Sequence, residues 1–159
     1  MTVASLEMSD EPKITDEAVK HSNVKLIPAG TTLLSFKLSI GKTAIAGKDL
    51  YTNEAIAGLI PKDLKKVENK YLFYLFNGQL IDLSTSGNKA FGKSLNSTYL
   101  NSELVIPLPP LSIQQQIVKE CEAIDEEYNT SRMTIETYRK KISDIFDRLE
   151  VVAKSNTGG

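Results

Sequence analysis

The sequence divides at Pro107-Leu108-Pro109-Pro110-Leu111-Ser112-Ile113-Gln114-Gln115-Gln116-Ile117-Val118. Pro109 and Pro110 cannot continue a helix backwards, and they hold the chain extended ahead of any helix that follows. Ser112 and Gln115 have the spacing of a capping box, in which the two side chains bind backbone N–H groups of the first turn. We therefore expect a globular part before the prolines and a helix after them, joined by a stiff elbow.

The segment after the prolines has an apolar repeat of 3.5 residues. Its seam positions are separated alternately by four and three residues, and each is apolar or aromatic except Ser131. They are Ile117, Cys121, Ile124, Tyr128, Ser131, Ile135, Tyr138, Ile142, Ile145, Leu149 and Val152. A repeat of this kind over about five heptads is typical of a coiled coil. The pattern predicts one helix over residues 111–153, roughly 60 Å long at about 1.5 Å per residue.

A helix of that length needs another long helix to cover its apolar seam, and the sequence predicts no second long helix. The seam therefore predicts a homodimer whose interface is made by Ile117, Cys121, Ile124, Tyr128, Ile135, Tyr138, Ile142, Ile145 and Leu149. Cys121 is the only cysteine, so no internal disulfide can form, which suits a reducing cytoplasm. Packing of Cys121 in the seam is favoured over a disulfide between two chains.

Composition and charge set bounds on the rest. The 159 residues are 41% hydrophobic and 25% charged, which fits one domain of about 110 residues with an appended helix. No apolar run reaches the ~18 to 20 residues of a membrane span, and the N-terminus has no basic and apolar leader, so a cytoplasmic protein is expected. Residues 21–110 carry ten lysines against six acidic residues, a balance of +4 that is a weak footprint for nucleic acid.

Residues 23–110 read as an α/β (α+β) globular domain with short strands in a small curved sheet. Strands are expected at 24–27, 31–36, 43–46, 55–60 and 104–106, separated by glycine and proline turns. Asn69 to Phe76 is apolar on nearly every side, which predicts a buried helix capped by Asn69 and stopped by Gly78. Residues 1–22 are expected to be a partly disordered lead-in with a short helix at 16–22, and residues 154–159 a frayed tail.

Residues 84–96 are a polar, glycine-bearing segment. Lysine ammonium groups, hydroxyls and amides of this kind can contact phosphates and base edges. The candidate DNA contacts are Ser86, Asn88, Lys89 and Lys93, together with Lys37 and Lys42 from the sheet region. A solvated surface loop is the simpler interpretation of the same composition. No arginine precedes Arg132, so lysine, asparagine or glutamine would have to read bases in the globular part.

Gly87-Asn88-Lys89-Ala90-Phe91-Gly92-Lys93-Ser94 also matches the letters of a phosphate-binding loop. That motif requires a buried strand directly before it and a helix directly after it. The residues before it are polar and the stretch after it is too short for the helix, so nucleotide hydrolysis is disfavoured. The lone His21 has no cysteine, second histidine or carboxylate pair beside it, so neither a catalytic group nor a metal site is predicted.

Several stretches, taken in order, resemble the specificity subunit of type I restriction–modification enzymes. They are residues 34–42, 52–57, the helix at 71–75 and above all the junction at 106–118. The resemblance implies that the globular part is a target recognition domain, which reads one half of a split sequence in double-stranded DNA. It implies that the long helix is a spacer, which pairs antiparallel with another such helix and docks methyltransferase subunits.

The same resemblance implies a non-catalytic chain without a cofactor of its own. S-adenosylmethionine and ATP would belong to the methyltransferase subunits and the restriction subunit. Family members usually carry two recognition domains and two helices, so this chain resembles a half-subunit that dimerises to restore the two-fold arrangement. An alternative is a truncated assembly module, which dimerises and docks methyltransferase subunits without reading DNA.

Overall fold

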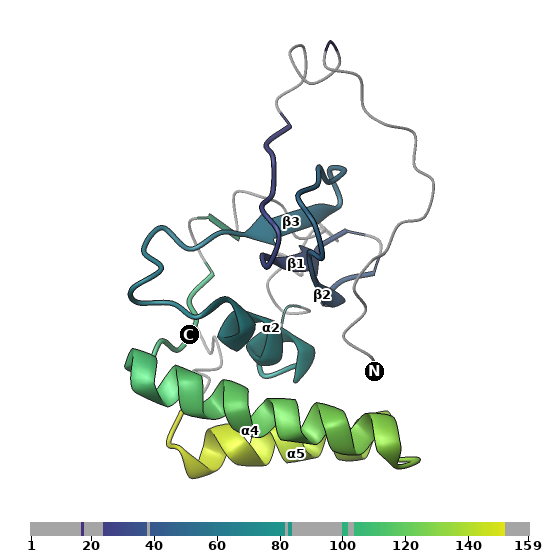
Figure 1. Ribbon diagram of the computed structural model, residues 1–159, viewed down its shortest axis with the longest axis vertical. Helices are drawn as coiled ribbons and strands as arrows, with labels where there is room; N and C mark the ends of the chain where they lie inside the picture. The colour runs from purple at the N-terminus through teal and green to yellow at the C-terminus, as the bar shows by residue number, and fades with distance from the viewer. Residues whose placement is uncertain are drawn as a thin grey trace, which may run out of the picture.

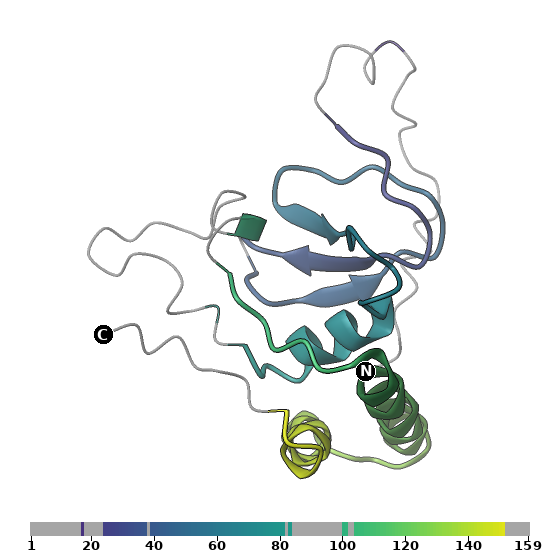
Figure 2. The ribbon, with the colours of Figure 1, turned by 90° about the vertical axis from the view of Figure 1, so that its left-hand side faces the viewer.

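The computed structural model describes Glu17 and residues 24–37, 39–81, 83, 100–101 and 104–151. These residues form three layers, namely a small antiparallel sheet, helix α2 (Asn69–Asn77), and a hairpin of helices α4 (Leu111–Thr130) and α5 (Ile135–Arg148) (Figures 1 and 2). The expected lead-in at 1–22 and tail at 154–159 fall outside the described residues, apart from Glu17. The α+β class is therefore confirmed in its sheet and helices, while the helical part differs from the expectation.

The sheet has the order β2-β1-β3, with β1 at Thr32–Ser35, β2 at Thr43–Ile45 and β3 at Ile56–Leu59. Both pairings are antiparallel, and Leu34 in the central strand lies opposite Thr43 and Ala57. The strand expected at 24–27 is reduced to a single bridge between Ile27 and Leu50. Residues 104–106 form no strand, because Leu104 and Ile106 place their side chains on the core beside Phe76 instead of pairing with the sheet edge.

Helix α2 is the middle layer and is buried all around. Every residue from Tyr71 to Asn77 is buried, which confirms the prediction from its composition. One side of α2 packs on β1 and β2, and another packs on α4. The residue at its N-cap is Glu68 and not Asn69, and the helix ends before Gly78 as expected. A Cβ at Gly78 would lie 2.8 Å from Ile142 Cγ2, so only glycine allows the hairpin to approach this closely.

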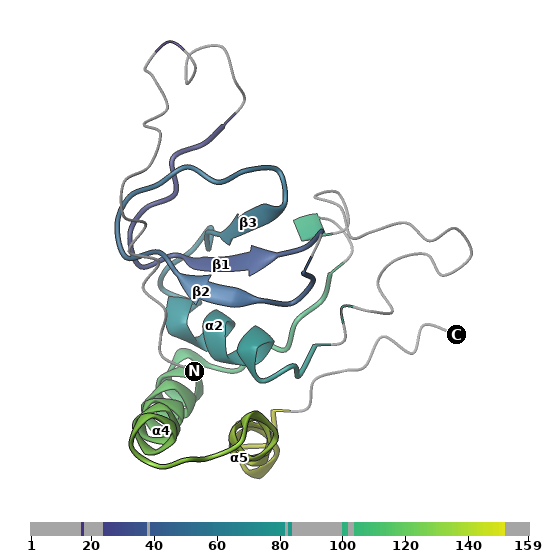
Figure 3. The ribbon, with the colours of Figure 1, turned by 90° about the vertical axis from the view of Figure 1, so that its right-hand side faces the viewer.

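The prediction of one continuous helix over 111–153 is wrong. Helix α4 ends at Thr130, the chain is extended at Ser131, and α5 begins at Ile135 and runs back beside α4 (Figures 1 and 3). The apolar seam side chains of α4 and α5 therefore meet one another and α2 within one chain. Ile117, Cys121, Tyr138 and Ile142 have no exposed surface. The premise that no element of this chain could cover the seam is wrong for the same reason.

Local polar groups explain the break between α4 and α5. The hydroxyl of Thr130 donates to the Glu126 carbonyl at 2.9 Å, and that of Ser131 donates to the Glu127 carbonyl at 2.6 Å. The Glu127 carbonyl also accepts from the Ser131 N–H at 2.9 Å, so the hydroxyls add second bonds to carbonyls of the last turn. Side-chain bonds of this kind weaken or bend a helix. Thr134 then caps α5, since its hydroxyl accepts from the Thr137 N–H at 3.2 Å. The residues that end α4, Thr130 and Ser131, and the residue that caps α5, Thr134, therefore lie within one heptad of the apolar repeat.

The start of α4 also differs from the expected capping box. Its N-cap residue is Pro110, and no side chain caps the helix there. Gln114 is fully buried instead, and its amide nitrogen donates to the carbonyls of Lys66 and Pro109, both at 2.8 Å. Its amide oxygen accepts from the Glu68 N–H at 2.9 Å. Gln114 thus fixes the first turn of α4 to the elbow and to the segment that leads into α2.

A buried carboxylate joins the three helices. Asp125 of α4 accepts hydrogen bonds from the hydroxyls of Tyr74 in α2 and Tyr138 in α5, and Asn77 donates to the Tyr138 oxygen at 2.9 Å. Burial raises the pKa of both tyrosines, and their hydrogen bonds to Asp125 raise it further, so both stay protonated donors. Burial, followed by the nearby Asp125 charge, also raises the pKa of the Cys121 thiol, which therefore stays unreactive.

Replacing Asp125 with alanine is expected to lower the free energy of unfolding by about 2–4 kcal/mol, because two buried tyrosine hydroxyls lose their acceptor at once. Urea denaturation followed by circular dichroism measures this loss. Glu126→Ala is the matched control, since Glu126 is the exposed neighbour on the same helix and should change stability by less than about 0.5 kcal/mol. Equal unfolding midpoints for the two variants would contradict the role given to Asp125.

Candidate nucleic-acid interface

The turn between β1 and β2 carries two of the candidate lysines. Ser35 N–H donates to the Lys42 carbonyl and Gly41 N–H donates to the Ser35 carbonyl, both at 2.9 Å, so the turn is closed by backbone bonds. Gly41 has φ +86°, a left-handed conformation that favours glycine. Lys42 is exposed beside it. Lys37 is partly exposed and lies 3.3 Å from the Glu54 carboxylate, whose side chain is 88% exposed.

The residues that flank the polar segment lie next to this turn. Leu83 is buried with Phe36 and Leu34, and Leu100 packs on the same cluster. A Cβ at Gly41 would lie 4.0 Å from Leu83 Cδ1, so the turn itself contacts the start of the segment. The candidates Ser86, Asn88, Lys89 and Lys93 lie outside the described residues. The structure therefore brings Lys37 and Lys42 to the place where that segment leaves and re-enters the fold.

A groove of about 800 Å³ runs along β3 and is called the β3 groove below. Lys37 lines it near the start of β3 and Ile60 lines it just past the end of the strand. Its polar side chains are Lys25, Lys37, Thr52, Asn53, Glu54 and Asn101. Of these, the sequence singled out only Lys37 as a contact, although Thr52-Asn53-Glu54 was part of the stretch that carried the resemblance. The groove offers cations and amides, which are the groups that contact phosphates and base edges.

The side-chain amides of Asn53 and Asn101 in the β3 groove differ in how many of their atoms are available to a ligand. The Asn53 side-chain oxygen already accepts from the Ala55 N–H at 2.9 Å, so it fixes the start of β3. Asn101 is exposed. Reading adenine needs the oxygen and the nitrogen of one amide together. Asn101 is therefore the better placed of the two for a base edge, and only its position in the fold shows this.

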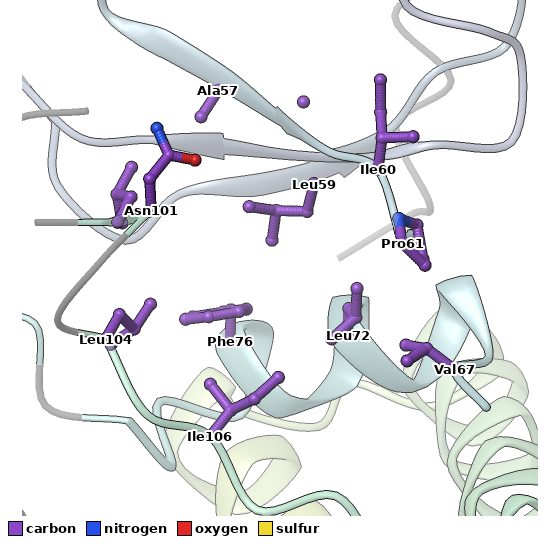
Figure 4. A pocket seen from close by; sticks show the side chains of 12 residues that line it. Ala57, Leu59, Ile60, Pro61, Val67, Leu72, Phe76, Asn101, Leu104 and Ile106 are labelled. Carbon is purple, nitrogen blue, oxygen red and sulfur yellow. The ribbon is translucent and has the colours of Figure 1, made fainter. Parts of the chain in front are cut away.

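An apolar cavity of about 320 Å³ lies on the other side of β3, between that strand and α2. Figure 4 shows Leu59 of β3 facing Leu72 and Phe76 of α2 across it, with Leu104 and Ile106 at its border. Asn101 is the one polar side chain that lines it. A cavity with this lining cannot hold phosphate or pair with base edges, so of the two spaces beside β3 only the β3 groove offers polar contacts.

Two further searches cover only the part of the chain that the structure describes. No group of three or more His, Cys, Asp or Glu side chains is placed to hold a metal ion there. Likewise, none of the helices in the described ranges has the length and apolar character needed to cross a membrane.

Comparison with known proteins decides the family. Residues 2–137 match the family described as type I restriction modification DNA specificity domain. The chain belongs to this family. Over 139 residues, 86% of its length, it is 32% identical to the type I restriction enzyme MjaIX specificity subunit of Methanocaldococcus jannaschii. Over 123 residues, 74% of its length, it is 30% identical to the type I restriction enzyme EcoR124I/EcoR124II specificity subunit of Escherichia coli.

The chain matches only part of these specificity subunits. The aligned region covers 31% of the Methanocaldococcus subunit and 30% of the Escherichia coli subunit. A second Methanocaldococcus protein, the putative type I restriction enzyme MjaX specificity subunit, is 30% identical over 29% of its length. This chain therefore corresponds to about one third of a specificity subunit, and the resemblance noted in the sequence is confirmed at the level of the family.

Replacing Gly41 with alanine is expected to destabilise the domain by about 1–2 kcal/mol, because a Cβ is strained at a left-handed φ. Thermal unfolding of the purified chain measures the effect. The matched control is Ser39→Ala in the same exposed turn, whose φ is not left-handed, and it should leave the midpoint unchanged. A neutral Gly41→Ala variant would mean that the turn carrying Lys42 is not held in this conformation.

Proposed function

We propose that this chain is the recognition unit of a type I restriction–modification specificity subunit, which binds duplex DNA and reads one half of a split target. The observation that carries the proposal is the family match over residues 2–137, joined to the placement of Lys37 and Asn101 in the β3 groove and of exposed Lys42 in the neighbouring β1–β2 turn. Leu83 and Leu100, which flank the polar segment 84–96, pack beside the β1–β2 turn. The candidates Ser86, Asn88, Lys89 and Lys93 of that segment would extend the surface formed by Lys37 and Lys42.

In this proposal the chain itself is not catalytic. Methyl transfer and cleavage, with S-adenosylmethionine and ATP, would belong to methyltransferase and restriction subunits that assemble with it. What this chain would supply is the choice of site. Lysines at the β3 groove would bind phosphates and set the position on DNA, and amides such as that of Asn101 would discriminate between bases.

The double variant Lys37→Gln with Lys42→Gln, which removes two positive charges, is expected to weaken binding to duplex DNA. Each lost phosphate contact removes about 0.9 from the slope of log affinity against log salt, so two contacts remove about 1.8. Fluorescence anisotropy with a random labelled duplex, between 50 and 200 mM salt, measures affinity and slope together. Lys119→Gln with Lys140→Gln on the exposed side of the hairpin removes the same charge and should leave both unchanged.

The outcome also separates the proposal from its alternative. If the unchanged chain binds no duplex at 50 mM salt, even with its methyltransferase partner, the recognition function fails. The chain would then be an assembly module that docks subunits without reading DNA. If both double variants lose the same affinity, net charge alone explains binding and the turn has no special role.

We further propose that the chain dimerises by exchanging α5 between two copies. Within one chain, the interface expected at Ile117, Cys121, Ile124, Tyr128, Ile135, Tyr138, Ile142, Ile145 and Leu149 is already used between α4, α5 and α2. The linker Ser131-Arg132-Met133-Thr134 contains neither glycine nor proline, and the apolar repeat continues through it in frame. If the linker became helical, α5 of one copy could make the same contacts on the other.

The variant Ser131→Leu with Thr134→Ala is expected to shift the monomer–dimer equilibrium of the chain toward the dimer. It removes the hydroxyl that ends α4 and the cap of α5, and it fills the one polar seam position with an apolar side chain. Light scattering after size exclusion, over a hundredfold range of concentration, measures the change. Asn129→Ala, an exposed change on the last turn of α4, is the control. A variant that stays monomeric at the highest concentration would refute the exchange.

A further inference from the structure

The segment between β3 and α2 presents a cluster of lysines that no other part of the sequence matches. Lys62, Lys65 and Lys66 are exposed and fall within five residues, with Asp63 as the one acidic residue among them. In the described part of the chain, neither Lys62 nor Lys65 takes part in an ion pair, and Lys66 is 3.8 Å from Asp63. This segment, residues 62–66, is called the lysine loop below, and it is the teal loop that projects beside α2 in Figure 1.

The lysine loop is held rigidly by its own backbone bonds and by α4. The Asp63 carboxylate accepts from the Lys65 N–H at 2.9 Å, and the Lys66 N–H donates to the Asp63 carbonyl at 3.1 Å. Asp63 is thus used to shape the turn as well as to offset charge. The side-chain amide of buried Gln114, in the first turn of α4, also donates to the Lys66 carbonyl at 2.8 Å. A loop fixed in this way loses little backbone entropy when its lysines bind a ligand, so the entropy cost is limited to the side chains.

The lysine loop follows the β3 groove along the chain. Ile60 lines the groove at the end of β3, and the chain passes through Pro61 directly to Lys62. Lys37 lines the same groove near the other end of the strand. Figure 3 shows the β1–β2 turn at one end of the sheet and the exit from β3 toward α2 at the opposite end. Four strand residues span about 13 Å, close to the ~12 Å width of a DNA major groove.

We propose that Lys62 and Lys65, with Lys66 beside them, bind phosphates of the DNA backbone at the far end of the β3 groove. Lys37 and Lys42 would hold phosphates on one side of a DNA groove, and the lysine loop would hold those on the other. This inference rests on the proposed DNA-binding function and adds a second cationic site to it. The contact would set affinity and position, not sequence choice, because phosphates are the same at every base pair.

An acidic protein partner is the competing occupant. Leu64 is 68% exposed in the lysine loop, and Leu108 is 48% exposed and lines a small groove together with Lys65 and Lys66. Apolar side chains ringed by charge can mark a protein-binding surface. The position of the lysine loop two residues past Ile60, at the end of the β3 groove, favours DNA, since both cationic sites then serve one ligand. The two occupants predict different results in one set of variants.

The test compares Lys62→Gln with Lys65→Gln against the control pair Lys119→Gln with Lys140→Gln, in the full chain. Affinity for a labelled random duplex at about 100 mM salt is expected to fall roughly tenfold or more for the loop pair, and the salt slope to lose about 1.8. The control pair should match the unchanged chain. Charge reversal at Lys62 and Lys65 to glutamate should weaken binding further, while thermal unfolding stays the same for all variants.

Each result has a distinct meaning. If the unchanged chain binds DNA and the loop pair binds equally well, the inference is wrong while the proposed function stands. If the unchanged chain binds no DNA, the proposed function fails and the inference falls with it. If the loop pair keeps its DNA affinity but no longer co-purifies with a co-expressed methyltransferase subunit, the lysine loop is a protein-docking surface and the inference is overturned.

Discussion

The packing of helix α2 on two sides is the constraint on which the described structure depends. Its residues Tyr71 to Asn77 are buried, and a helix of nine residues that is apolar all around cannot be stable on the surface of a sheet alone. The sheet covers one side, and the α4–α5 hairpin covers another. α5 is therefore part of the core of a single chain, because its Tyr138, Ile142 and Phe146 belong to the same cluster as α2.

Two buried polar side chains of α4 determine how that hairpin sits. Gln114 and Asp125 are eleven residues apart, which is about three helical turns, so both face the same way. Gln114 binds three backbone groups before α2 and at the elbow, and Asp125 binds side chains of α2 and α5. Buried polar groups add little net stability, but each mispaired register would leave them without partners. Apolar packing supplies the attraction here, while these groups select one arrangement of helices.

The parts of the fold that depend on local signals could be predicted from the sequence, and those that depend on tertiary contacts could not. Glycine and proline turns placed the three strands that form, though not the expected strands at 24–27 and 104–106, and the uniform apolar character of α2 identified it as buried. The hairpin was missed because an apolar repeat of 3.5 residues is the same in an open helix and in two helices that fold back. Threonine and serine also occur in the interior of helices. The part that Thr130, Ser131 and Thr134 play at the helix ends is therefore visible only in the structure. In the candidate interface, Lys37 and Lys42 could be proposed only as lysines of the sheet region, and the structure places them at the two ends of the β1–β2 turn. Asn101, Gln114 and the lysine loop belong to no motif and gain meaning only from their neighbours.

The proposed DNA contact and the proposed exchange of α5 depend on different ends of α4. Gln114 fixes the lysine loop from the first turn of α4, whereas the linker that would open the hairpin begins at Ser131. Seventeen residues of helix, about 25 Å at 1.5 Å per residue, separate them. Opening the linker leaves the bonds of Gln114 intact, because these go to Lys66, Glu68 and Pro109 and none goes to α5. The elbow and the lysine loop therefore keep their geometry whether α5 folds back on its own chain or on a second copy. A stiff α4 anchored at its start would then hold the proposed DNA-binding surface at a fixed angle to the helices through which two copies would join.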